Sequence, residues 1–248
     1  MDLTRVDSRG IVVSVRGAVN NVGTLAPWPE NWLNFGVMGP FGFLPFMQCY
    51  HGILSATHST SGFIDWKEGG GIPKQISLRG KGYLEKDWGQ VFPSAYIWMQ
   101  CNHFEIHQDA SIIFAVAIVP LPIPTLGSVR GFFCGLYLGK GNWNRWATYM
   151  PGCKITTFNI DQGRGFSVAI ETSERALNID ARMPSDVEEL PRCGIPTRKG
   201  FVKELIESLN GTVAISWKIK GRAAGKGGLL FQDVGNFAGV ELFKTQNF

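Results

Sequence analysis

Two acidic residues stand beside a tryptophan in EKDWGQVFPSAYIWMQCNHF, the stretch that covers residues 85–104. Glu85 and Asp87 are close to Trp88 and Phe92, so at least one carboxyl could lie against apolar surface. Burial raises the pKa of a carboxyl, and a carboxyl that stays protonated near neutral pH can act as a general acid. The alternative is a turn that carries two solvated acids.

The residues that follow, 95–104, are predicted to form a strand, whose side chains alternate between two faces. A buried amide without a partner costs about 1–3 kcal/mol. The amides on this strand therefore either bond to neighbouring backbone groups or face a small-molecule pocket, which is typically apolar with a few oriented polar groups. One face carries Tyr96, Trp98, Gln100, Asn102 and Phe104, and the other carries the core-like set Ala95, Ile97, Met99, Cys101 and His103.

Further candidates lie upstream in FLPFMQCYHGILSATH, which supplies Gln48, Tyr50, His51 and His58. A lone histidine is more often structural than functional. His51 ranks above His58 because it precedes Gly52, and a glycine lets a strand approach a ligand or a neighbouring chain closely.

The elements that must position these side chains are predicted to be strands. The chain of 248 residues contains 17 Phe, 8 Trp, 5 Tyr, 31 Gly and 13 Pro, a composition typical of short strands and tight turns. Period-two alternation predicts an antiparallel barrel or sandwich that encloses a ligand space. The expected fold class is all-β, with an antiparallel, lipocalin-like β-barrel. The predicted strands are 10–19, 49–56, 62–66, 74–84, 95–104, 111–119, 128–138, 143–149, 153–160, 165–172, 176–182, 211–220, 228–232 and 238–243.

One short amphipathic helix is predicted over residues 199–209, KGFVKELIESL, from apolar residues at 201, 202, 205, 206 and 209. The chain is predicted to form one domain over 1–248. Its best candidate boundary, PRCGIP at 191–196, is expected to be a surface loop.

Composition excludes several classes of protein. A net charge of +4 gives no argument for a nucleic-acid partner. The five cysteines are odd in number and contain no CxxC pair, so neither disulfides nor a metal site is predicted. The N-terminus lacks the apolar core of a signal peptide, and the longest apolar run, 112–126, is short and contains three prolines. A cytoplasmic protein without a transmembrane segment is expected.

Basic residues outnumber acidic ones by seven to two between residues 198 and 226. The usual interpretation is a solvated face. The alternative is peripheral contact with anionic lipid.

Five segments together resemble the tocopherol cyclase family, and they follow the family pattern in order along nearly the whole chain. The histidine in CYHG is more typical of microbial members, and the family's upstream segment, which reads roughly FEGWYF, is not found in this chain. The segments are FMQCYHGILS (46–55), GKGYLEKDWGQVFPSAYIWMQCNHF (80–104), GFFCGLYLGKGNWNRWATYMPGCKI (131–155), KELIESLNGTVAISW (203–217) and LLFQDVGNFAGVEL (229–242).

The resemblance implies closure of a chromanol ring on a prenylated hydroquinone, without a cofactor. A proton reaches the trisubstituted alkene, and the phenolic oxygen traps the tertiary cation. Asp87 is the expected general acid, Glu85 its alternate, and His51 a further catalytic residue. Trp88 and Trp98 are expected to stabilise the cation by about 0.5–2 kcal/mol each. The expected substrate-binding residues are Gln48, Tyr50, Trp88, Phe92, Tyr96, Trp98, Gln100 and Asn102.

Two other functions fit the same residues. A lipid-binding β-barrel would hold a prenyl lipid without chemistry, and a hydratase would let water capture the cation. The partner in each case is a hydrophobic prenylated phenol or quinol, and the oligomeric state is left open.

Overall fold

The computed structural model describes residues 2–6, 10–31, 36–45, 47–120, 127–161, 164–184, 192–197, 200–221 and 228–248. Regular structure in these residues is almost entirely antiparallel strand, which confirms the predicted all-β class. The first strands are β1 (Asp2–Val6), β2 (Val12–Val22), β3 (Cys49–Glu68), β4 (Lys74–Gly89), β5 (Tyr96–Cys101), β6 (Ser111–Pro120) and β7 (Ser128–Tyr137). They are followed by β8 (Trp143–Ala147), β9 (Lys154–Asp161), β10 (Gly165–Glu171), β11 (Arg175–Arg182), β12 (Cys193–Thr197), β13 (Gly200–Ile219) and β14 (Leu229–Phe243). Two 3-10 helices are described, η1 (Gly36–Phe43) and η4 (Thr245–Asn247).

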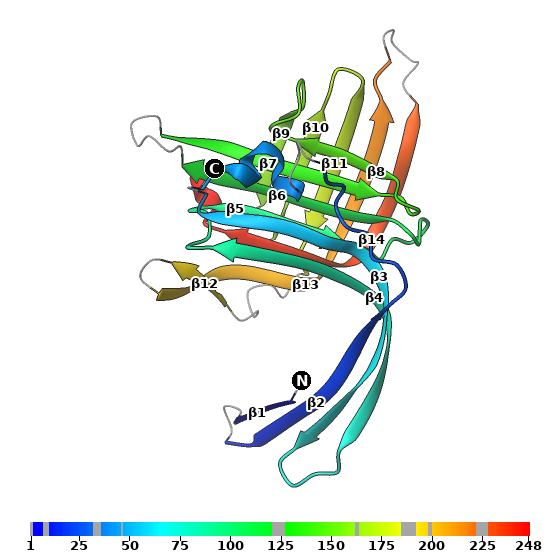
Figure 1. The fold of residues 1–248 in the computed structure, drawn as a ribbon, viewed down its shortest axis with the longest axis vertical. Coiled ribbons are helices and arrows are strands. Elements are labelled where there is room, and N and C mark those ends of the chain that lie inside the picture. The colour runs from blue at the N-terminus through cyan, green and yellow to red at the C-terminus, as the bar shows by residue number, and fades with distance from the viewer. Residues whose placement is uncertain are drawn as a thin grey trace.

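The strands form two sheets (Figure 1). The smaller has the order β1-β2-β3-β4, and the larger has the order β8-β7-β6-β5-β14-β13-β11-β10-β9, with β12 paired to β13. A closed barrel requires the two end strands of a sheet to pair with each other. Among the described residues, no such pairing joins β8 to β9 or β1 to β4, so the predicted closed barrel is wrong.

The main core lies on one face of the larger sheet. Side chains from β5, β6 and β7 meet side chains from β9, β10, β11, β13 and β14, and the rings of Phe114 and Phe166 stack with centroids 5.4 Å apart. Ile97, Met99 and Cys101 of β5 point into this core, as the alternation predicts. Phe104 also packs in this core, against Phe231, because β5 ends before it and the alternation stops there.

A second layer covers the opposite face of β6, β7 and β8. Trp28 and Ile53 pack there against Phe133 in a separate buried cluster. The segment before η1 bonds to β3, with Trp28 N donating to Ile53 O at 3.1 Å and Ala56 N donating to Ala26 O at 2.8 Å. These contacts fix the first half of β3 over the larger sheet.

The remaining parts of β3 and β4, together with β1 and β2, project from the body as an arm (Figure 1). Its side chains are largely solvent-exposed, and Val19 and Ile76 keep 57% and 52% of their surface. The arm therefore buries little apolar area, and the pocket-forming residues lie elsewhere.

The predicted helix at 199–209 is wrong. Residues 200–219 form β13, which pairs with β12 over residues 200–205 and with β14 over residues 206–218. The apolar positions fit a helix, but Phe201 and Leu209 stay exposed while Leu205 and Ser208 are buried. Pairing with these neighbouring strands overrides the local preference.

The predicted loop at 191–196 is also wrong in its described part. Residues 193–197 form β12, an edge strand that tolerates Pro196 because its other side pairs with no strand among the described residues. Residue 191 lies outside the described residues. Elsewhere pairs of predicted strands merge, since 49–56 and 62–66 belong to β3, and 228–232 and 238–243 belong to β14.

In the described part of the chain, no helix has the length and apolar character needed to cross a bilayer. Of the basic residues between 198 and 226, the structure describes Lys203, Lys218 and Lys220. The other four lie outside the described residues.

Candidate functional site

The register between β3 and β4 brings three predicted site residues together. His51 stands directly opposite Asp87, and Ile53 stands opposite Glu85. The alternative of a turn at EKDWG is therefore wrong, because these residues lie inside β4. In a strand, Glu85 and Asp87 project to the same face, and this face also carries Tyr83.

His51 lies between the two carboxylates. Its Nδ1 is 2.8 Å from Asp87 Oδ1, and its Nε2 is 3.1 Å from Glu85 Oε2. The second contact is close but poorly aligned for a hydrogen bond. Burial by itself lowers the pKa of His51, yet the bonds and charges of Asp87 and Glu85 outweigh burial and raise it to about 9. His51 is therefore an imidazolium at neutral pH. We call these three residues the His51 cluster.

Glu85 is fixed by two further donors. The Tyr83 hydroxyl donates to Glu85 Oε2, and the Trp98 indole N–H donates to the same oxygen at 3.2 Å. Glu85 therefore acts as an acceptor that ties β4 to β5. The side chains of His51, Glu85 and Asp87 are 13%, 22% and 25% exposed, so the cluster is largely buried but still reachable.

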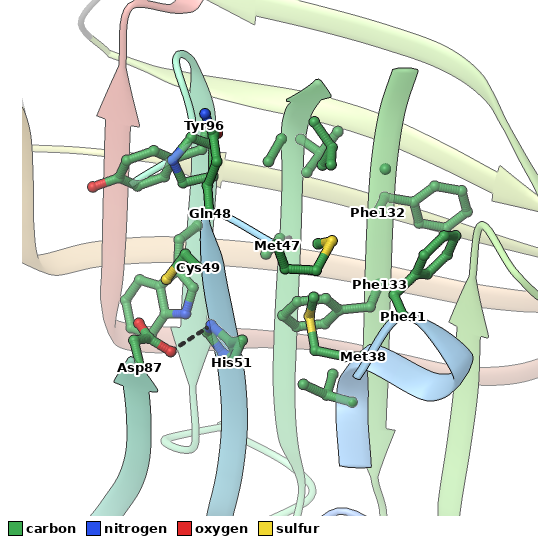
Figure 2. A pocket seen from close by; sticks show the side chains of 18 of the residues that line it. Met38, Phe41, Met47, Gln48, Cys49, His51, Asp87, Tyr96, Phe132 and Phe133 are labelled. Carbon is green, nitrogen blue, oxygen red and sulfur yellow. Dashed lines mark ion pairs between the residues drawn. The ribbon is translucent and has the colours of Figure 1, made fainter. Parts of the chain in front are cut away.

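The His51 cluster opens onto an apolar pocket with a volume of about 210 Å³. A water molecule occupies roughly 30 Å³ of liquid, so the pocket has room for an organic group. Figure 2 shows its walls, with Gln48, Cys49 and His51 on one side and Phe132 and Phe133 facing them. Its apolar lining includes Val37, Met38, Phe41, Ala115, Ala117 and Phe133. Its polar lining includes Gln48, His51, Glu85, Asp87, Thr148 and Glu241.

Helix η1 covers part of the pocket. Gly39 has a positive φ of 55°, and a Cβ at this position would lie 2.6 Å from the Tyr149 ring. The Tyr149 hydroxyl donates to Val37 O at 3.0 Å. This close contact places Met38 and Phe41 against the opening (Figure 2).

The structure places seven of the eleven predicted site residues in the pocket lining. Beside the His51 cluster these are Gln48, Phe92, Tyr96 and Trp98. The rings of His51 and Phe133 also lie 4.9 Å apart, which gives the imidazolium an aromatic neighbour. The catalytic and binding roles of these residues remain predictions.

The other four predicted residues lie outside the pocket lining. Trp88 is 46% exposed and stacks on Tyr50, with ring centroids 5.5 Å apart. Gly52 lies against the Trp88 ring, and a Cβ at position 52 would be 3.2 Å from that ring. Asn102 Nδ2 donates to Gly82 O at 3.1 Å, so this amide bonds to a neighbouring backbone group, as the alternative interpretation of the strand expects. Gln100 is buried among the strands.

Sequence reasoning missed Glu241 on β14. This residue lines the pocket and stands opposite Trp98 in the sheet. The signal available in the sequence was a lone acid in the apolar alternation of GVELF. Sequence reasoning also gave no sign that Gln48 Oε1 would be buried without a hydrogen-bond partner among the described residues.

The His51 cluster could in principle hold a cation, because its ligand atoms lie within 4.8 Å of one another. A metal-binding imidazole must give up its proton. Here both ring nitrogens already face carboxylates, and the pKa of about 9 keeps the ring charged. The imidazolium offsets one of the two negative charges of Glu85 and Asp87.

The fold and the site define an open antiparallel β-protein with an acid–base cluster at the rim of an apolar, ring-lined pocket. Residues 24–242 match the family described as Tocopherol cyclase-like, and the chain belongs to this family. Membership supports a cyclase or isomerase type of function in general.

Among solved structures, the chain is similar to the crystal structure of a protein assigned as AttH from Nitrosomonas europaea. The two share 11% sequence identity with a TM-score of 0.47, over 97% of this chain and 68% of the other. No curated protein matches the chain.

Proposed function

We propose that the protein is a cofactor-independent cyclase that closes a chromanol ring on a prenylated hydroquinone. The observation that supports this most directly is the His51 cluster at the rim of an apolar pocket. A prenyl chain needs apolar walls, and a phenol needs a small number of oriented polar groups. The pocket offers both.

In this proposal the phenol lies at the polar end of the pocket. Gln48 Oε1, which has no partner among the described residues, accepts a hydrogen bond from the second hydroxyl of the hydroquinone, the one that does not cyclise. Aromatic side chains also line the pocket, among them Phe41, Phe133 and Trp98, and the last two lie next to the His51 cluster, where the reacting alkene would be. Their ring faces stabilise a tertiary cation by about 0.5–2 kcal/mol each.

The geometry suggests a revised role for Asp87. Its Oδ1 faces the protonated His51, so it is held as a hydrogen-bond acceptor. As the phenolic oxygen bonds to the cationic carbon, its O–H becomes strongly acidic and a carboxylate is a sufficient base. We therefore assign Asp87 to accept the phenolic proton, with His51 holding it in place, and Glu85 to anchor His51.

Orientation contributes as much as the base. An oxygen held near the cationic carbon reacts as an intramolecular nucleophile, and well-oriented reactions of this kind gain about 7–11 kcal/mol at most. The apolar lining disfavours water beside the cation, which water would otherwise capture. The reaction adds no atoms, so substrate and product are isomers.

The test is incubation of the purified protein with hydroquinones that carry one, two or four isoprene units. The expected product has the mass of the substrate and the retention of a chromanol. Binding without conversion would indicate a lipid carrier, and a gain of one water would indicate a hydratase. Either result overturns the proposal.

A matched pair of variants tests the site itself. Asp87→Asn should lower turnover by about 100-fold or more, because a neutral amide cannot accept the proton. Asp65→Asn is the control, since Asp65 lies on the arm and bonds to Gln75. Equal turnover in the two variants would remove Asp87 from the mechanism.

A further inference from the structure

A second acid reaches the same pocket from another part of the chain. Glu241 lies on β14 between Val240 and Leu242, which both point into the main core. Glu241 therefore projects from the opposite face of the larger sheet, where it lines the pocket. Its neighbour across the β5–β14 ladder is Trp98, whose indole N–H binds Glu85. Glu241 and the His51 cluster thus line the same pocket and share Trp98 as a neighbour.

The neighbour of Glu241 on its other side is also an acid. Glu207 of β13 stands directly opposite it. Directly opposed residues in an antiparallel pair have Cβ atoms about 4.5–5.5 Å apart, and like charges at this separation repel. Two neighbouring carboxyls avoid this repulsion when one of them keeps its proton. Glu207 Oε2 already accepts a hydrogen bond from the Cys193 thiol at 3.0 Å, and we place the retained proton on Glu241, which lines the pocket.

The surroundings of Glu241 agree with this assignment. Burial is the largest cause that raises the pKa of Glu241, and the negative charge of Glu207 is the second. The Tyr96 hydroxyl lowers the pKa by less, so the pKa rises to about 7. The charges that act most strongly on it are all negative. The ionisable groups around it are Tyr96 on β5, Glu207 on β13, Cys193 on β12, Tyr83, Glu85 and Asp87 on β4, and His51 on β3.

We propose that Glu241 is the proton donor of the cyclisation, an inference that rests on the proposed function. The Glu241 proton forms a C–H bond at the less substituted alkene carbon, and the π electrons of the C=C bond are consumed in this step. The phenolic oxygen then forms the C–O bond to the tertiary cation. Its proton passes to Asp87 and on to solvent, while Glu241 recovers a proton from solvent.

This division gives each acid one task. Asp87, beside an imidazolium, accepts a proton, and Glu241, beside another acid, supplies one. A reaction that needs an acid and a base together commonly uses two carboxyl groups that lie in different surroundings.

The first experiment measures cyclisation of the prenylated hydroquinone by Glu241→Gln. A loss of about 100-fold or more is expected, because general acids contribute about 10²–10⁴-fold. Glu174→Gln is the matched control, since Glu174 is exposed in the turn between β10 and β11. Binding of a hydroquinone with a saturated side chain should be kept in both variants, which shows that the pocket is intact.

The second experiment records the pH dependence of turnover. The wild-type rate should fall above about pH 7 as Glu241 loses its proton. Glu207→Gln removes the opposing charge, so the fall should move to lower pH while the maximal rate is kept. A structural role for Glu207 would lower the rate without moving the profile.

The outcomes separate the two proposals. If the wild-type protein cyclises the probe and Glu241→Gln keeps full turnover, Glu241 is not the proton donor. The proposed function stands in that case. A wild-type protein that converts no probe overturns the proposed function itself. Infrared spectra give a readout without turnover, because the protonated carboxyl band at neutral pH should vanish in Glu241→Gln. If wild type lacks that band, Glu241 is not the donor.

Discussion

The two acidic groups of the pocket are stabilised in opposite ways. In the His51 cluster, a cation lies between two carboxylates, and Tyr83 and Trp98 donate further hydrogen bonds. In the Glu207–Glu241 pair, two acids face each other across β13 and β14, and the charges that act most strongly on Glu241 are negative. The first arrangement favours charged groups, and the second favours one retained proton. Pocket chemistry thus depends on what stands opposite each acid, more than on the acid itself.

This contrast predicts two separate pH windows of stability. The pKa of His51 is raised from 6.5 to about 9, so its stabilisation is complete below pH 6.5 and is lost as the pH rises through 9. The loss should approach about 3 kcal/mol in the free energy of unfolding. Urea denaturation between pH 6 and 10 measures it. His51→Gln should remove this dependence, and an unchanged profile in that variant would contradict the cluster.

The Glu241 window lies lower. Its pKa is raised from 4.5 to about 7, so the folded state holds the extra proton between these values and stability falls as the pH rises through them. The expected loss is also about 3 kcal/mol at most. Glu241→Gln should abolish this slope and leave the His51 window intact. Loss of both windows in one variant would show that the two groups titrate as one unit.

A third acid, Asp233, shows how a carboxylate is stabilised chiefly by the backbone. Burial alone would raise its pKa, but hydrogen bonds from His107 and from the amides of Ile106 and Val234 lower it. This stabilisation is present above pH 3.8 and is lost as the pH falls through the lowered pKa. Asp233→Asn should cost about 2 kcal/mol at neutral pH. Thermal unfolding at pH 7 and pH 3 measures it, and an equal cost at both would contradict this account.

The two tryptophans beside the His51 cluster provide the smallest effect. Trp98 lines the pocket and binds Glu85, whereas Trp88 stacks on Tyr50 outside the pocket lining. Trp98→Leu should lower turnover by about tenfold through lost ring contact with the cation. Trp88→Leu should change it by less than about threefold. The measurement is the cyclisation rate of each variant with the same prenylated hydroquinone. A larger loss in Trp88→Leu than in Trp98→Leu would show that Trp88, and not Trp98, contacts the cation.

The strand content was predictable because alternation is local. Ile97, Met99 and Cys101 show it plainly, and they do form one core face. Barrel closure was not predictable, since it depends on whether β8 and β9 meet, and no local pattern encodes that. The sequence of β13 satisfies a helical pattern as well as a strand, and only its neighbours β12, β11 and β14 decide between them.

The site was predictable in the same partial way. His51, Glu85 and Asp87 could be chosen from their residue types and from the family resemblance. Their grouping depends on the register of β3 with β4, which an inserted or deleted residue would change. Glu241 lies far along the chain, and it reaches the pocket only because β14 pairs with β5.

The ladder between β3 and β4 is interrupted twice just beyond the site, between Ile53 and Ser55 and between Ser55 and His58. Such irregularities let one strand gain or lose a residue locally. A change of length in the arm would be absorbed there, and His51 would still face Asp87. We therefore expect the arm to tolerate a change of length on its side of these irregularities, while the pairing of His51 with Asp87 is kept.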